Sequence, residues 1–212
     1  METKLNYKRT FLIGLAFLSI CSFWQMYDNI IPLILQNTYH LGETMTGAVM
    51  ALDNVLAIFL LPVFGMLSDK VHTKLGRRMP FIVSGTILAV IFMMLLPMID
   101  NAEKARWGTV ESFSNQVIFL AVLFFTLVSM GLYRSPAVAL MPDVTPNHLR
   151  SRANAVINLM GAVGGVYALI MIKVLVGKGE TPDYLPLFAS IAAVMVIAVG
   201  ILVITIRENK LR

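Results

Sequence analysis

The chain has 212 residues, of which 58% are hydrophobic and only 14% are charged, and its formal net charge is +5. A soluble domain usually carries about 25% charged residues. Apolar runs recur here instead, each near the roughly 20 residues that a membrane-spanning helix needs. The composition therefore indicates an integral membrane protein. The single cysteine, Cys21, excludes a disulfide within one chain and any cysteine-rich zinc site.

The apolar runs predict an all-α membrane protein with six transmembrane helices. Lipid offers no hydrogen bonds to the backbone, so each run must be helical. The expected spans are 11–35, 44–67, 80–98, 116–140, 153–176 and 185–206. Lys8 and Arg9 precede the first run as in a signal peptide, but the run is too long and lacks a small-residue cleavage site, so we expect a retained helix.

The basic residues favour one orientation. With the N-terminus inside, the inner segments hold most of them, while the outer loops hold only Lys104, Arg106 and Lys178. Cytoplasmic loops carry such an excess of lysine and arginine. We therefore expect a multi-pass protein of the cytoplasmic membrane with both termini in the cytoplasm. The same placement marks the positive charge as a topology signal, and no nucleic-acid partner is expected.

Polar residues gather on one side of the first span, at Gln25, Asp28 and Asn29 together with Cys21 and Ser22. At 100° per residue they fall within an arc of about 120°. Polar side chains in a membrane helix cost free energy unless they face water or protein. One interpretation is a cavity wall in which Asp28 binds a proton or a substrate hydroxyl. The other is a hydrogen-bonded seam between helices.

The second span carries Asp53 and Asn54 at a depth similar to that of Asp28. Two carboxylates at one depth can share a proton or bind a cation, because each disfavours the charge of the other. We therefore predict a coupling role for at least one of them. The alternative is that each is capped locally by the asparagine that follows it.

The fourth span brings Tyr133 and Arg134 to one polar face, about two turns from the predicted inner end. A guanidinium in a membrane normally faces protein or water. Arg134 is expected to bind substrate or act in gating, or else to pair with Asp69 or Asp143 as a structural tie. The offset from the carboxylates of the first two spans is about 14 Å, which argues against a direct pair.

The fifth span has Asn154, Asn158, Gly161 and Gly165 on one helical stripe. Gly161 and Gly165 form a small-xxx-small pair, which lets two helix backbones approach closely. The stripe predicts a helix–helix contact, possible also with a second bundle, and Asn158 is a candidate lining residue.

The connection between the second and third spans is the most charged run of the chain. Gly65 permits close helix approach, Asp69 lies at the end of the second span, and Arg77 and Arg78 precede the third. A carboxylate and two guanidiniums at such a junction can tie helix ends together in one conformation. We predict a latch.

Two motifs resemble the major facilitator superfamily. The first is Gly-x-Leu-Ser-Asp, six residues, then Gly-Arg-Arg-x-Pro, over residues 65–80; the second is Pro-Ala-Val-Ala-Leu-Met-Pro-Asp-Val-Thr over 136–145. The spacing between Asp69 and Gly76 in the first motif is similar to that of the sucrose/proton symporters and of the glycoside-pentoside-hexuronide symporters, and the second motif is similar to the sucrose branch. The resemblance implies that residues 1–206 form an N-terminal six-helix half-transporter and that 207–212 begin a central loop.

The resemblance also implies roles for particular residues. Helices one, two, four and five would face the central cavity, and Asp69, Arg77, Arg78 and Asp143 would form the cytoplasmic gate. Two positions depart from the sodium-linked branch, because Ala57 and Leu61 replace its aspartates. The sucrose branch carries an arginine at the position of Val138, and Arg134 lies one turn earlier on the same face.

These observations favour a secondary transporter for a sugar or glycoside, without cofactor or metal. The resemblance to the sucrose branch implies that transport is coupled to protons. No nucleophile–base constellation points to an enzyme. The alternative is a non-transporting six-helix protein that binds a partner or senses a signal. A transporter of this family needs twelve helices. The chain is therefore expected to be a truncated product, or else a half that pairs with a second copy or a separate C-terminal half.

Overall fold

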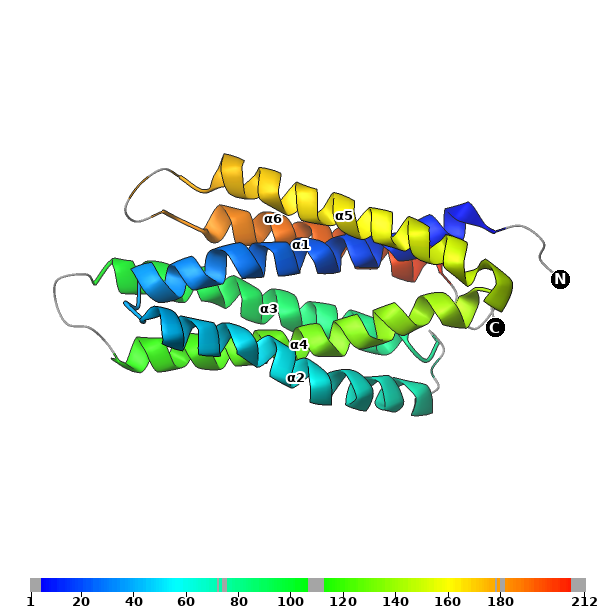
Figure 1. Cartoon of the computed structure of the whole chain (residues 1–212), viewed down its shortest axis with the longest axis horizontal. Coiled ribbons are helices and arrows are strands. Elements are labelled where there is room, and N and C mark those ends of the chain that lie inside the picture. Colours follow the sequence, from blue (N-terminus) through cyan, green and yellow to red (C-terminus); the bar gives the residue numbers. More distant parts are fainter. Residues whose placement is uncertain are drawn as a thin grey trace.

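The computed structural model describes residues 5–71, 73, 76–106, 113–177, 179 and 182–206, and its long helices run side by side (Figure 1). The predicted central loop at 207–212 lies outside the described residues. The helices are α1 (Tyr7–Asn37), α2 (Glu43–Lys70), α3 (Met79–Lys104), α4 (Phe113–Val144), the 3-10 turn η1 (Asn147–Leu149), α5 (Arg150–Leu175) and α6 (Leu185–Thr205). The described part contains no β-strand beyond an isolated bridge between Thr73 and Gly76.

The all-α prediction with six helices is confirmed, although α1 to α5 are longer than the expected spans and only α6 nearly coincides with its span. Helix α1 begins at Tyr7 because the Asn6 side chain accepts a hydrogen bond from the Arg9 backbone N–H at 3.1 Å. Helix α4 continues to Val144, past Pro136 and Pro142. An apolar run marks only the part of a helix that crosses hydrocarbon, so the capped, more polar ends were underestimated.

Helix α1 lies at the centre of the bundle. It packs most extensively on α5 and also contacts α6, α4 and α2, while α3 packs on α4 and α6. The core is built from fully buried aromatic and aliphatic side chains of several helices, among them Phe23, Tyr27, Ile30, Phe119 and Phe188. Helix α1 therefore contacts four other helices, while Asp28 and Asn29 on its surface remain exposed.

The closest helix approach joins α1 and α5. A Cβ atom added to Gly164 would lie 2.0 Å from the Leu18 carbonyl oxygen, so only glycine fits there. The Ser22 hydroxyl donates to the Gly164 carbonyl oxygen at 2.9 Å and reinforces the contact. The predicted helix contact of the fifth span therefore exists, although its tightest point is Gly164 rather than the Gly161–Gly165 pair.

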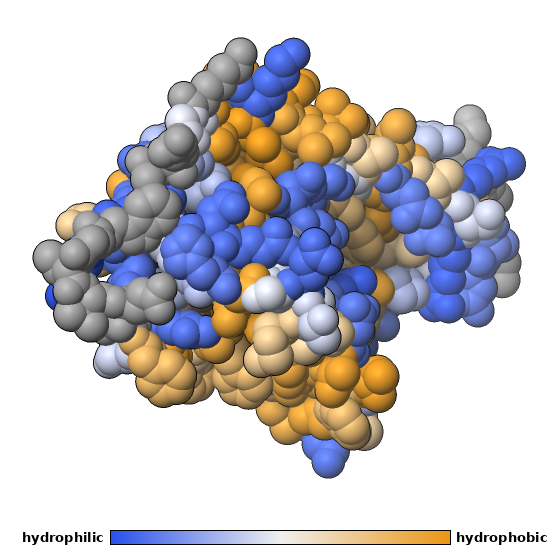
Figure 2. Space-filling view, turned by 60° about the vertical axis from the view of Figure 1, so that its left-hand side comes forward, coloured by the Kyte–Doolittle hydropathy of each residue, from blue (hydrophilic) through white to orange (hydrophobic). Residues whose placement is uncertain are grey.

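The flanks of the bundle are apolar and exposed. All six helices are long and apolar enough to cross a membrane. Large hydrophobic side chains such as Ile58, Phe59 and Val174 project outward from α2 and α5. Figure 2 shows hydrophobic residues along the sides and hydrophilic residues gathered at the end where α1 joins α2 and α5 joins α6. This surface suits a multi-pass membrane protein.

Candidate functional site: a polar cavity and a charged latch

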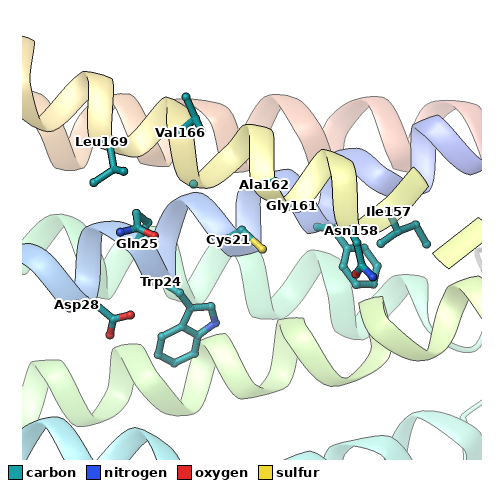
Figure 3. A pocket seen from close by; sticks show the side chains of 12 residues that line it. Cys21, Trp24, Gln25, Asp28, Ile157, Asn158, Gly161, Ala162, Val166 and Leu169 are labelled. Atoms are coloured by element: carbon teal, nitrogen blue, oxygen red, sulfur yellow. The ribbon is translucent and has the colours of Figure 1, made fainter. Parts of the chain in front are cut away.

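A cavity of about 450 Å³ opens between α1 and α5. Pockets for small molecules usually measure about 300–1,000 Å³. Figure 3 shows side chains of both helices around it. Its lining residues are Phe17, Cys21, Trp24, Gln25, Asp28, Ile157, Asn158, Gly161, Ala162, Gly165, Val166 and Leu169.

Three of the predicted site residues meet in this cavity. Gln25 and Asp28 come from α1, and Asn158 comes from α5. Carboxylate and amide groups both accept hydrogen bonds, and the amides also donate. An otherwise apolar wall with a few convergent polar groups can orient a hydroxylated solute. The polar face of α1 therefore faces a cavity at these positions, whereas Ser22, beside them, takes part in the α1–α5 seam.

A second, smaller cavity of about 20 Å³ lies beside the first and is lined by Asp53 and Arg134 among apolar residues. Its volume suits about one water molecule. Asn54 donates from Nδ2 to Asp53 Oδ1 at 2.9 Å, the local capping that the sequence left open. Among the described residues no ion pair joins Asp53 to Arg134, although both line the same space. Trp24 lines both cavities.

The Arg134 guanidinium lies against an aromatic ring. Its Cζ is 5.5 Å from the centroid of the Trp24 ring, within cation–π range. The alternative tie of Arg134 to Asp69 or Asp143 does not occur, because both carboxylates pair with Arg78. Arg134 therefore remains next to the cavities.

Three predicted site residues, Tyr133, Asn29 and Asn54, line neither of these cavities. Tyr133 is fully buried, its hydroxyl lies 2.7 Å from the Ser19 hydroxyl, and it donates to the Ala16 carbonyl oxygen at 3.1 Å. It belongs to the α1–α4 packing and lines neither cavity. Asn29 is exposed and donates to the Gln25 carbonyl oxygen of its own helix at 2.7 Å. The faces assigned from helical periodicity were too wide to separate these residues from Asp28 and Arg134.

Arg78 organises a latch at the opposite side of the fold from the α1–α2 turn. Its Nη2 lies 2.7 Å from Asp69 Oδ1 and its Nε lies 3.0 Å from Asp143 Oδ2. Its Nη1 donates to the Ser68 hydroxyl at 2.7 Å and to the Gly65 carbonyl oxygen at 3.4 Å. The guanidinium is buried and thus joins the ends of α2, α3 and α4.

The latch differs from the predicted one in two members. Arg77 is half-buried and pairs with no carboxylate among the described residues, so one guanidinium rather than two makes the contacts. Ser68 is fully buried and was not singled out, although it lies within the loop motif. Gly76 has φ of 122°, a backbone conformation that favours glycine and turns the chain back toward α3.

The other end of the bundle carries a polar cluster that sequence reasoning missed. Asp100 is fully buried, and it accepts hydrogen bonds from Lys104 Nζ at 2.6 Å and from the Thr38 hydroxyl at 2.7 Å. Lys104 Nζ also donates to the Pro182 carbonyl oxygen at 2.7 Å and lies 4.5 Å from the Tyr184 ring centroid. This cluster, Thr38–Asp100–Lys104, ties α1 and α3 to the residues before α6.

Nearby tyrosines lie outside the helices. Tyr184 is buried, and its burial, together with the Asp100 carboxylate, raises the pKa of its phenol. The pKa of Tyr39 is raised by burial first, and then by Asp100 and Glu103. Both phenols therefore stay neutral. Among the described residues no group of three or more His, Cys, Asp or Glu could hold a metal ion.

The amino-acid sequence is similar to a known protein family. The model of the Major Facilitator Superfamily matches residues 4–169. A sucrose transport protein of Oryza sativa subsp. japonica, SUT3, is 26% identical over 137 residues, which is 61% of this chain and 27% of that protein. The sucrose transport protein SUC4 of Arabidopsis thaliana is 34% identical over 116 residues, 51% of this chain and 22% of that protein.

A third relative is an uncharacterized symporter of Synechocystis sp., 24% identical over 144 residues, 66% of this chain and 25% of that protein. The chain thus matches about a quarter of the length of these relatives. They are transport proteins rather than enzymes. Three observations point to the same family. The chain has six helices of membrane-spanning length, the Arg78 latch lies within the loop motif, and the family model matches most of the sequence. The chain belongs to the Major Facilitator Superfamily.

Proposed function

We propose that this chain is the N-terminal six-helix half of a secondary transporter that moves a sugar or glycoside, coupled to protons, across the cytoplasmic membrane. Both termini would lie in the cytoplasm, as the distribution of basic residues indicates. The second bundle would be a C-terminal half or another copy of this chain. Transport would proceed by alternating access, in which two bundles rock around a central site.

The observation that carries the proposal is the polar cavity within an apolar bundle. Gln25, Asp28 and Asn158 line about 450 Å³ of space between α1 and α5. Ionisable and amide side chains are rare in membrane helices and mark solute or proton pathways. Two of the relatives reported above are named sucrose transport proteins. A hydroxylated solute fits this donor and acceptor set.

Proton coupling is proposed for Asp28 and Asp53. The two carboxylates interact electrostatically, although Asp28 lines the large cavity and Asp53 the small one. Two carboxylates that interact in this way can titrate as a pair and share one proton. Ala57 and Leu61 occupy the positions of the sodium-linked aspartates, which supports protons over sodium as the coupling ion.

The test is uptake of labelled sucrose and other sugars into sealed vesicles that carry the protein expressed from its intact locus. We expect an inward proton gradient to drive accumulation. Asp28→Asn and Asp53→Asn should each lower uptake driven by the proton gradient at least tenfold. At least one of the two variants should still exchange sugar across the membrane without a gradient. Glu43→Gln is the matched control, because Glu43 is an exposed carboxylate in the first turn of α2.

Undiminished coupling in both aspartate variants would reject these residues as proton sites. Absence of uptake for every sugar tested, with the protein folded in the membrane, would reject sugar transport. Binding of a sugar or a protein without any uptake would instead support a six-helix binding or sensing module.

A further inference from the structure

Trp24 is the residue that connects the two cavities. It lines the large cavity with Gln25 and Asp28, and it lines the small cavity with Asp53 and Arg134. Figure 3 shows its ring extending from α1 next to the Asp28 side chain. A large aromatic ring between a candidate solute cavity and a charged pocket can contact contents of both.

The ring is positioned by aromatic neighbours rather than by a hydrogen bond. Phe23 and Tyr27 meet it edge to face, with centroid distances of 5.3 and 5.4 Å. The indole Nε1–H is buried and has no hydrogen-bond partner among the described residues. A buried unpaired N–H costs free energy. A polar solute in the large cavity could accept a hydrogen bond from this N–H if the indole turned toward it.

Arg134 adds a charge to one side of this ring, with Cζ at 5.5 Å from its centroid. The guanidinium forms no ion pair with a carboxylate among the described residues, and its cation–π contact is with the Trp24 ring. An aromatic face also attracts the polarised C–H groups that cover one side of a sugar ring, since the π-system is negative at its face.

We propose that Trp24 is a substrate-contacting residue, on whose indole a sugar ring in the cavity between α1 and α5 packs its C–H face. The inference rests on the proposed function and names the class of solute: a cyclic sugar with one apolar ring face. Contact with the solute on the side of the large cavity would change the contact of Trp24 with Arg134 on the side of the small one. A solute in the large cavity would in this way alter the surroundings of Asp53 in the small cavity.

The test uses the fluorescence of Trp24. The chain has two tryptophans, and Trp107→Phe leaves Trp24 as the sole tryptophan, which is excited selectively over the tyrosines at long wavelength. Sucrose and methyl glucoside, titrated into this variant in detergent or vesicles, should change its emission saturably. Mannitol has similar hydroxyls but no ring face, and it should have no effect. Arg134→Gln in the same background should shift the emission before any sugar is added.

Affinity is measured separately in the two-tryptophan protein by equilibrium binding of labelled sucrose. Trp24→Leu should weaken binding about tenfold, the loss of one aromatic stacking contact. Trp24→Phe keeps an aromatic face and should lose only about two- to threefold. The phenylalanine variant guards against misfolding as the cause, and thermal unfolding of both variants is recorded alongside.

The outcomes separate the two proposals. Uptake by the unaltered protein together with unchanged affinity in Trp24→Leu would overturn the role of Trp24 and leave the transport proposal intact. Sugar binding that depends on Trp24 without uptake would support this inference and reject transport. Equal responses to mannitol and sucrose would contradict stacking. A protein that neither binds nor transports any of these sugars would overturn both proposals.

Discussion

Arg78 Nε donates to Asp143 Oδ2 at 3.0 Å and so joins the start of α3 to the end of α4, two parts of the chain 65 positions apart. The same guanidinium reaches Asp69 at the end of α2. One buried cation thus fixes three helix ends. Charge-assisted hydrogen bonds of this kind are about twice as strong as neutral ones. Alternating access requires such ties to form in one state and break in another.

Replacement of Arg78 tests the latch. Arg78→Gln should lower the free energy of unfolding by about 2–3 kcal/mol, because a buried set of charge-assisted hydrogen bonds is lost and Ser68 loses its donor. Thermal unfolding in detergent measures the change. Arg77→Gln, at the adjacent half-buried guanidinium, is the matched control and should be nearly neutral. A larger loss at Arg77 than at Arg78 would contradict the assignment.

Replacement of glycines tests the α1–α5 seam. Gly164→Ala would place a Cβ atom 2.0 Å from the Leu18 carbonyl oxygen, so the two helices must separate. We expect a cost of about 1–3 kcal/mol or more, as for overpacked cores. Gly165→Ala is the control one position away, because its nearest atom, Gln25 Oε1, lies at an ordinary 3.7 Å.

Gly165→Ala should be neutral or slightly stabilising, since alanine is the better helix former by about 1 kcal/mol. Thermal unfolding again compares the two variants. Equal effects at both positions would show that the seam is not packed as described.

The Thr38–Asp100–Lys104 cluster permits a double-mutant cycle. Lys104→Met removes the cation from a carboxylate that is 0% exposed, and we expect a loss of about 3–5 kcal/mol. Asp100→Asn combined with Lys104→Met should cost less than the sum of the single changes, because no unpaired charge remains. Additive losses in unfolding experiments would mean that the pair is not coupled.

The helices of this fold could be predicted from the sequence, whereas the register between them could not. Apolar runs mark helices because lipid offers the backbone no hydrogen bonds, so each run must pair its own backbone groups. Pro80 marks the start of α3, because proline is favoured in the first turn of a helix. The latch aspartates and Arg78 were also predictable, since the loop motif contains Asp69 and Arg78 and the second motif contains Asp143. Trp24 was missed because an aromatic residue in an apolar helix carries no distinctive local pattern, and only the packing of α1 against α4 and α5 sets it between two cavities.

Other misses have the same origin. The i, i+4 spacing of Asp100 and Lys104 was visible, but their burial depends on Thr38 and Pro182, which are far away in sequence. Tyr133 was placed with Arg134 because the assigned polar face was wide enough to hold both, although consecutive residues of a helix point about 100° apart. The structure turns Tyr133 toward Ser19 and Arg134 toward Trp24. A helical face tells which residues are neighbours, but the crossing of the helices decides what they meet.

The most direct test of the account is the reaction of Cys21 with a small, charged methanethiosulfonate reagent. Cys21 is the single cysteine of the chain and lines the cavity with Gln25 and Asp28. If this cavity is a water-filled path for a sugar, the folded protein should be labelled, and sucrose or the sugar it transports should slow labelling several-fold. Cys21→Ser gives the background. A cysteine that reacts only after unfolding, or at the same rate with and without every sugar tested, would contradict the central claim.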